Sequence, residues 1–317
     1  MADTPDTLLN YILELDVRTP TADANTSYLR AAVAVVKPKT GVSTGTLTKV
    51  ISATAAAALT DNTDIAQLFA AGMEWVYVLP SDDLDIDDAL ANTSERFKTV
   101  LISSDFTESD LENLDVGAFT GVVAAPFTTQ AKAKAFAALQ NHSAWLNATV
   151  TTKGANMFYT WGEFLSATQW NNNQYISLPK DDGITNLAVA KSLFEDRISF
   201  ALTSEDYGPR LAFFGVGGQA IIAPYVTEEL MNNLQAAALR YLNLNRPQYT
   251  LVQAKLLEKA LNKDAQTRYV DTGLLTYARV EITLVKSNYE GTVSVSIPEP
   301  SALWRLVGIL TQEAFNG

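Results

Sequence analysis

Apolar and polar residues alternate along two runs in the last third of the chain, residues 277–285 and 292–297. Polar residues such as Arg279 and Glu281 separate the apolar ones. A period of two predicts strands with one buried and one solvated face. Two strands alone are only marginally stable in water, so we expect further strands to complete this sheet. The alternating apolar positions are Val280, Ile282, Leu284, Val293, Val295 and Ile297.

A different pattern extends from about residue 62 to residue 215, where short apolar runs alternate with segments of helical character. Strands separated by helices favour a mostly parallel sheet with flanking helices. We therefore predict an α/β fold for this part of the chain. The predicted strands are residues 75–79, 99–103, 121–125, 148–152, 175–178, 198–202 and 211–214. The predicted helices are residues 65–71, 86–97, 108–114, 129–145 and 184–196.

The N-terminal part is interpreted as an extended arm that ends in a strand. Leu29–Val36 is an apolar run that stops at Lys37 and Pro38, and its strand residues include Ala31, Val33 and Val35. Residues 46–58 then suit a helix. Three segments follow from this interpretation: an arm and strand at 1–36, an α/β domain at 37–220, and a C-terminal α+β domain at 221–317.

The C-terminal domain begins with two predicted helices. Thr227 follows Pro224 and is a suitable N-cap, and a second helix is predicted over residues 248–263. The two alternating strands come next, forming a small sheet. A short apolar segment from Ser301 to Phe315 follows and is predicted to be helical, as the C-terminal arm.

Composition excludes several classes of function. The 317 residues carry a net charge of −12, which provides no basic surface for direct nucleic-acid binding. The absence of cysteine excludes disulfides, thiolate metal sites and cysteine nucleophiles. No apolar run reaches the roughly 20 residues that span a bilayer, and the N-terminus lacks the features of a signal peptide. We expect a protein made in the cytoplasm, without membrane insertion.

Candidate chemical sites are few, and each has a simpler interpretation. Gly215–Gly218 follows a predicted strand but lacks the third glycine of a dinucleotide loop, which favours a tight turn. Asp83, Asp85 and Asp87 have the spacing of a calcium loop without its glycine or its final glutamate. The single histidine, His142, has no partner that the sequence can identify. We therefore predict no catalytic residue, no metal site and no cofactor.

Aromatic and amide residues between Trp161 and Tyr175 would suit a carbohydrate, but an exposed loop between elements is the better explanation. The alternating strands allow two interpretations. Residues 29–36 complete the sheet within one chain, or a terminal arm supplies a strand to a neighbouring copy by β-augmentation. About 12 extended residues reach roughly 40 Å, so the arm is long enough for the second arrangement.

Taken in order, these segments resemble the contractile tail sheath proteins of phages and related injection machines. The similarity lies mainly in residues 198–317, including Ile198–Leu202, Ile221–Leu230 and the two closing strands, and in the alternation near residues 70–78. The resemblance implies a structural virion protein that polymerises around an inner tail tube and drives genome delivery on contraction. It also implies contacts with baseplate and tail terminator proteins, and assembly in the bacterial cytoplasm.

The resemblance also implies which residues interlock the subunits. These residues belong to the N-terminal strand, with Leu29, Ala31, Val33 and Val35, and to the two C-terminal strands. The resemblance further implies that the C-terminal helices face the tube. The chain has little room for the outer domains that many sheath proteins carry. Two alternatives remain open at this stage: an α/β enzyme that binds a small ligand near Gly215–Gly218, and a non-contractile tail-tube or coat protein.

Overall fold

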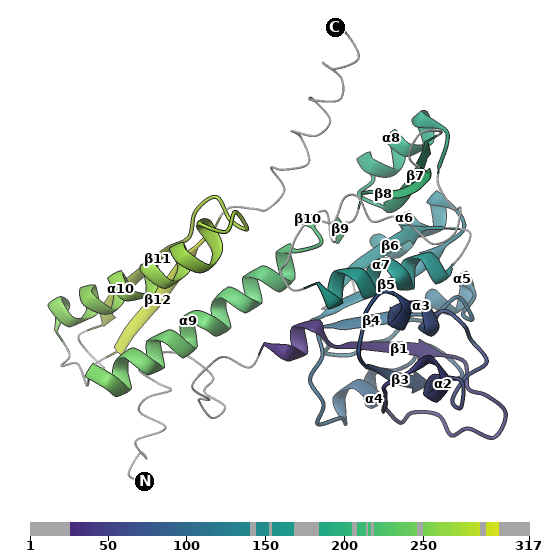
Figure 1. The fold of residues 1–317 in the computed structure, drawn as a ribbon, viewed down its shortest axis with the longest axis horizontal. Coiled ribbons are helices and arrows are strands. Elements are labelled where there is room, and N and C mark those ends of the chain that lie inside the picture. The colour runs from purple at the N-terminus through teal and green to yellow at the C-terminus, as the bar shows by residue number, and fades with distance from the viewer. Residues whose placement is uncertain are drawn as a thin grey trace, which may run out of the picture. The chain divides into compact units, whose positions relative to one another are not determined.

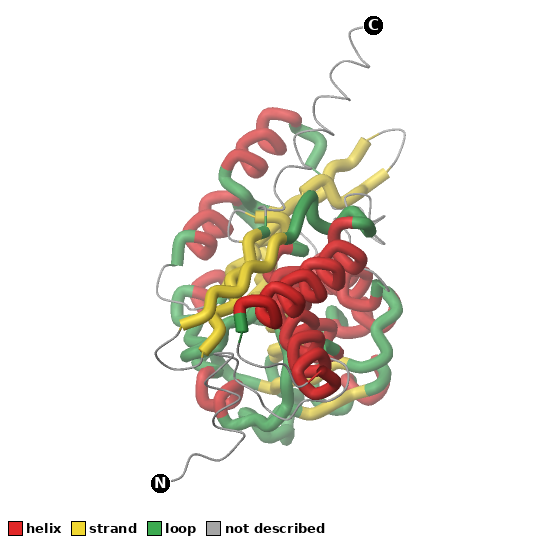
Figure 2. The backbone as a smooth tube through the Cα atoms, turned by 90° about the vertical axis from the view of Figure 1, so that its left-hand side faces the viewer, coloured by secondary structure: helices red, strands yellow, loops and turns green. Residues whose placement is uncertain are grey.

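The computed structural model describes residues 26–139, 144–151, 154–167, 184–204, 208–213, 215–216, 219–245, 250–285 and 290–297. The chain divides into two compact units, and both contain helices and strands (Figures 1 and 2). The α/β unit comprises Ser27–Tyr225, and the other unit, here called the C-terminal unit, comprises Val226–Gly317 together with Met1–Thr26.

An eight-stranded sheet forms the centre of the α/β unit (Figure 1). Its strand order is β2-β3-β1-β4-β5-β6-β7-β8. The six inner strands in this order pair in parallel, and the edge strands β2 and β8 pair antiparallel with their neighbours. The strands are β1 (Ala32–Val36), β2 (Thr48–Val50), β3 (Val76–Pro80), β4 (Thr99–Ile102), β5 (Val122–Phe127), β6 (Trp145–Val150), β7 (Ser199–Ser204) and β8 (Gly208–Phe213). The predicted α/β fold with a mostly parallel sheet is confirmed.

Short helices connect these strands. The longest of them in the described residues, α7, contacts α3, and Gly162 makes their close approach possible. A Cβ atom on Gly162 would lie 2.7 Å from the Ala71 Cβ atom. The helical elements of this unit are η1 (Ser27–Arg30), α2 (Ala53–Ala56), α3 (Ile65–Ala70), α4 (Asp87–Ala91), α5 (Glu108–Leu111), α6 (Gln130–Ala137), α7 (Gly154–Ser166) and α8 (Leu187–Glu195).

The core of the α/β unit is closed by an aromatic cluster of Trp161, Phe164 and Tyr225, all fully buried. The Tyr225 hydroxyl lies 2.7 Å from the Thr99 hydroxyl of β4, which satisfies both buried polar groups. Trp161 therefore belongs to the core and does not lie on an exposed sugar-binding loop. The neighbouring residues 168–183 lie outside the described part of the chain.

Two helices and a hairpin make up the described part of the C-terminal unit. Helix α9 (Ala223–Asn245) begins in the α/β unit, four residues before the predicted cap at Thr227. Helix α10 (Leu251–Ala265) is capped by Thr250, whose side chain accepts the backbone N–H of Gln253, and continues into the π-helical turn η2 (Gln266–Val270). The antiparallel strands β11 (Arg279–Val285) and β12 (Glu290–Ser296) follow.

Candidate inter-subunit surface

The hairpin of β11 and β12 has the two faces that the alternating pattern predicts. Val280 and Ile282 are buried, whereas Arg279, Glu281 and Thr283 are exposed. On β12, Ser294 and Ser296 are also exposed, but Val293 and Val295 are only half-buried. The apolar face is therefore well covered at Val280 and Ile282, and incompletely covered at Leu284 of β11 and along β12.

Each strand of the hairpin has an inner edge that faces its partner and an outer edge that faces away. Antiparallel pairs alternate between hydrogen-bonded and non-hydrogen-bonded positions, and Val280 and Ile282 are opposite Val295 and Val293. The Val280 and Ile282 amides bond to side chains of α10, so these pairs are the non-hydrogen-bonded ones. The backbone groups of all four residues therefore point toward the outer edges.

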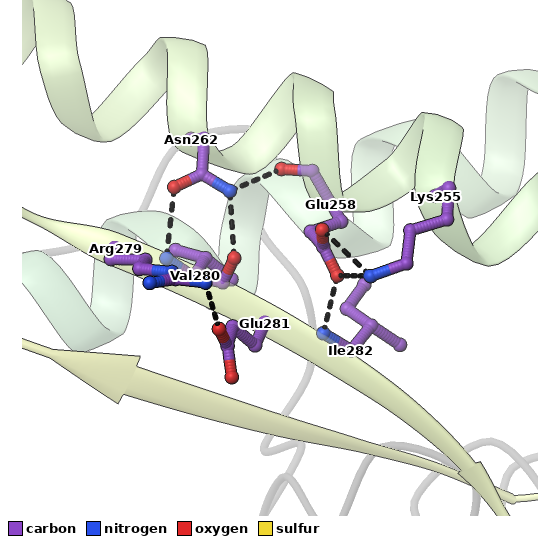
Figure 3. Close-up of polar contacts among 7 residues, drawn as sticks. All are labelled: Lys255, Glu258, Asn262, Arg279, Val280, Glu281 and Ile282. Carbon is purple, nitrogen blue, oxygen red and sulfur yellow. Dashed lines mark hydrogen bonds and ion pairs between the residues drawn. The ribbon is translucent and has the colours of Figure 1, made fainter.

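Asn262 of α10 occupies the outer edge of β11 as another strand would (Figure 3). Its Oδ1 atom accepts the Val280 N–H at 2.9 Å, and its Nδ2 group donates to the Val280 carbonyl at 2.7 Å. Nδ2 also donates to the Glu258 carbonyl at 2.9 Å, which fixes the orientation of the amide. A side-chain amide carries the same donor and acceptor as a peptide group, so it can replace one residue of a ladder.

Glu258 continues this edge one turn earlier on α10. Its Oε2 atom accepts the Ile282 N–H at 2.8 Å, and Lys255 Nζ lies 2.7 Å from the same oxygen (Figure 3). The pKa of the Glu258 carboxyl is lowered, first by its hydrogen bond with Lys255 and then by the Ile282 N–H. The carboxylate therefore stays ionised and remains an acceptor at neutral pH.

The outer edge of β12 differs from that of β11. Among the residues that the structure describes, β12 pairs with β11 alone. The hairpin is a two-stranded sheet in this part of the chain, and the outward backbone groups of Val293 and Val295 mark the edge where another strand can add.

Large apolar side chains are also exposed on the helices of this unit. On α10 these are Leu251, Val252 and Leu256, which are 65%, 69% and 47% exposed. On α9 they are Met231 and Leu244. Single exposed apolar residues are common, but three within six residues of one helix mark a surface suited to a protein partner.

The structure contradicts the predicted role of Leu29–Val36 as an interlocking strand. β1 pairs with β3 on one side and with β4 on the other, and its residues Val33 and Val35 are fully buried. Leu29 belongs to the short helix η1, and Ala31 is buried beside it. No edge is left for a second copy, because both sides of β1 already carry complete parallel ladders. The boundary of the arm correspondingly moves from residue 36 to residue 26.

The glycine-containing segment after β8 forms a small hairpin. β9 (Gly215–Val216) pairs with β10 (Gln219–Ala220), and the two residues between them lie outside the described chain. A phosphate loop needs a strand followed directly by a helix. Here the preceding strand is an antiparallel edge strand and the next element is a strand, which removes the structural context of the predicted ligand site.

The acidic run Asp83–Asp88 leads into a helix. Asp87 and Asp88 lie in the first turn of α4, where the helix dipole favours negative charge. The pKa of Asp85 is raised, mainly by a hydrogen bond with Asp87. The described residues hold no cluster of three side chains suited to bind a metal, and none of their helices is long and apolar enough to cross a membrane. His142 lies outside the described residues.

Comparison with known proteins identifies the fold. No family model matches the sequence, and no curated protein matches it. Among solved structures, the contracted helical sheath of the anti-feeding prophage aligns with a TM-score of 0.57 at 11% identity, covering 90% of this chain and 94% of that one. The contracted sheath of an extracellular contractile injection system, PVC, aligns at 0.58 and 11% identity, covering 90% and 92%.

A third solved structure is the sheath tail protein Lin1278 from Listeria innocua. It aligns with a TM-score of 0.52 at 8% identity, covering 89% of this chain and all of that one. The chain therefore shares the fold of contractile sheath proteins along nearly its whole length. This confirms, at the level of the fold, the resemblance inferred from the sequence.

Proposed function

We propose that this chain is a structural subunit of a contractile sheath that polymerises around an inner tube and moves that tube through a target envelope. The observation that carries the proposal is the match of about 90% of the chain to two sheaths in the contracted state. The similar solved structures are sheath proteins, so we assign the chain a structural role and no enzymatic activity.

Polymerisation in this proposal uses a strand from the N-terminal arm of a second copy. Because Leu29–Val36 belongs to η1 and β1 of the α/β unit, we place the donor strand earlier in the sequence, at residues 11–18. There Tyr11, Leu13, Leu15 and Val17 alternate with more polar residues, except at Ile12. The same period of two occurs in β11 and β12, and strand addition joins such segments through backbone hydrogen bonds.

The inner tube is the proposed partner of the exposed apolar residues on α10, Leu251, Val252 and Leu256. Baseplate and terminator proteins are the proposed partners at the ends of the polymer, in a phage tail or injection-system particle assembled in the bacterial cytoplasm. Contraction in this scheme derives its free energy from a difference in contacts between two lattice states, multiplied over many identical subunits.

Electron microscopy of the purified protein in negative stain tests this function. We expect hollow, ribbed tubes from the full chain. A chain that begins at Ser27 should remain folded, because the buried residues Tyr28 and Leu29 of the α/β unit are retained. It should be monomeric, because it lacks the proposed donor strand. A second variant changes Leu13, Leu15 and Val17 to serine. It keeps the length of the arm and removes only its apolar face, and it should also form no tubes. Normal tubes from either variant would refute the role of the arm, and absence of tubes from the full chain would refute polymerisation.

A further inference from the structure

We propose that Asn262 and Glu258 close the outer edge of β11 against strand addition, so that the arm of a second copy adds only to the outer edge of β12. This inference rests on the proposed function, because it assigns the edge at which the proposed arm binds.

The first step of the argument concerns hydrogen bonds. The Val280 N–H, the Val280 carbonyl and the Ile282 N–H are three successive outward groups of β11, and each has a partner on α10. A strand arriving at this edge would have to break these bonds and displace two side chains. One of the two is ionised and paired with Lys255, and hydrogen bonds to charged groups are stronger than neutral ones.

The second step concerns burial. Val280 and Ile282 are 1% and 6% exposed, so an added strand beside β11 would cover further apolar surface only at the half-buried Leu284. Val293 and Val295 are half-buried, and a third strand next to β12 would cover them. Residues Leu13, Leu15 and Val17 supply an apolar face of the required period. Both hydrogen bonding and burial therefore favour the same edge.

The third step concerns specificity. Exposed sheet edges pair indiscriminately unless the protein blocks them, and a two-stranded sheet has two such edges. If both edges were open, the same arm could add to either of them, and the lattice would have two possible connectivities. Closing one edge with side chains leaves a single acceptor for a single donor segment. Asn262 and Glu258 provide that closure from within the same chain.

Disulfide trapping distinguishes the two edges because the chain contains no cysteine. Donor subunits carry Glu14→Cys, Asp16→Cys or Arg18→Cys. Acceptor subunits carry either Ser294→Cys on β12 or Glu281→Cys, which is directly opposite on β11. Adjacent strands lie about 4.8 Å apart and next-but-one strands about twice that distance. A disulfide needs Cα atoms within about 6.8 Å, so it reports only the adjacent strand.

Donor and acceptor subunits are mixed, assembled and oxidised, and the covalent dimers are separated on a non-reducing gel. We expect dimers at Ser294→Cys to exceed those at Glu281→Cys roughly ten-fold, because only the adjacent strand is within reach. In acceptors that also carry Asn262→Ala and Glu258→Ala, dimers at Glu281→Cys should rise to a comparable level. Lys259→Ala is the matched control, since Lys259 is an exposed residue of α10 outside the contacts described for Asn262 and Glu258, and dimers at Glu281→Cys should stay low.

Two results would overturn the inference. Dimers at Glu281→Cys that equal or exceed those at Ser294→Cys in acceptors with an intact Asn262 and Glu258 would place the arm on β11. Absence of dimers at both positions would show that no arm of a second copy binds this hairpin. Microscopy of the same samples separates a wrong edge assignment from a wrong proposed function. Tubes that form without the cross-link at Ser294→Cys contradict only the edge assignment, whereas absence of tubes contradicts the proposed function.

Discussion

Truncation at three successive points tests where the arm ends and the α/β unit begins. The first variant begins at Ser27, the second at Ala31 and the third at Lys37. The first removes only residues outside the α/β unit, so the stability of this unit should equal its stability in the full chain. The third removes β1, the strand between β3 and β4, and should not fold, because the centre of the sheet is then missing.

The second variant lacks Ser27–Arg30, and its loss of stability can be estimated from the contacts of this segment. Leu29 is fully buried and Tyr28 is 8% exposed, and full burial of a large apolar side chain contributes about 1.5–3 kcal/mol. Arg30 donates to the carbonyl oxygens of Leu165, at 3.2 Å, and Ala167, which contributes about 1.5–3 kcal/mol more. These three contributions give an expected loss of about 4.5–9 kcal/mol, a large share of the roughly 5–15 kcal/mol that stabilises a typical domain.

Urea unfolding followed by tryptophan fluorescence measures this loss, because Trp75, Trp145 and Trp161 all lie in the α/β unit. With a slope of about 2–3 kcal/mol per molar urea, the midpoint should fall by about 1.5–4.5 M. Leu29→Ala should cost about 2–5 kcal/mol by itself, with Thr26→Ala as the matched control. Equal midpoints for the variants beginning at Ser27 and Ala31 would refute the assignment of this segment to the core.

Three further predictions concern single residues. Tyr225→Phe should lower the unfolding free energy, measured by urea unfolding, by about 1–2 kcal/mol, because the buried Thr99 hydroxyl loses its partner. An unchanged unfolding free energy would contradict the stabilising role of this hydrogen bond. Gly162→Ala should cost about 1–3 kcal/mol, since its methyl group would overlap α3, and a stabilised variant would contradict the contact. The folded pKa of Glu258 is lowered, so its stabilising effect is present above its ordinary value of about 4.3 and is lost as the pH falls through the lowered folded value. Exchange of the Ile282 amide, corrected for intrinsic rate, should therefore accelerate at acidic pH, and Glu258→Gln should abolish that dependence.

The central strands could be predicted from the sequence because strands of a parallel sheet are buried on both faces and form short apolar runs. The predictions for residues 75–79, 99–103 and 198–202 each fall within about two residues of β3, β4 and β7. The same physical rule identifies β1, whose five residues are all apolar. Its assignment to an arm rested on the polar residues before it, although a purely apolar strand has no solvated face to present at an edge.

The errors elsewhere have local causes. Residues 46–58 form β2 and the short helix α2, because the β-branched residues Thr48 and Val50 favour a strand. The predicted helix over 129–145 ends at Ala137, and β6 begins at Trp145. Helix α9 begins at Ala223 since Pro224 is well tolerated in a first turn. Helix α7, residues 154–166, was not predicted.

The edge closure by α10 could not have been predicted from sequence patterns. Asn262 lies 18 residues before Val280, and Glu258 lies 24 residues before Ile282, so the contacts depend on how the helix packs against the hairpin. An asparagine within a helix has no local signature that distinguishes a ladder substitute from a solvated side chain. The alternating strands, by contrast, are a local pattern and were predicted correctly.

The incomplete hairpin and the complete central sheet have opposite consequences for assembly. The α/β sheet contains eight strands and buries its parallel members on both faces, so it can fold without a partner. The hairpin contains two strands and relies on α10 for the outer edge of β11. A sheet that folds without a partner does not depend on strand exchange, whereas a two-stranded sheet with one closed and one available edge gains stability from a neighbour. The capacity to polymerise should therefore reside in the C-terminal unit and the arm, and the α/β unit should stay monomeric whatever the state of the lattice.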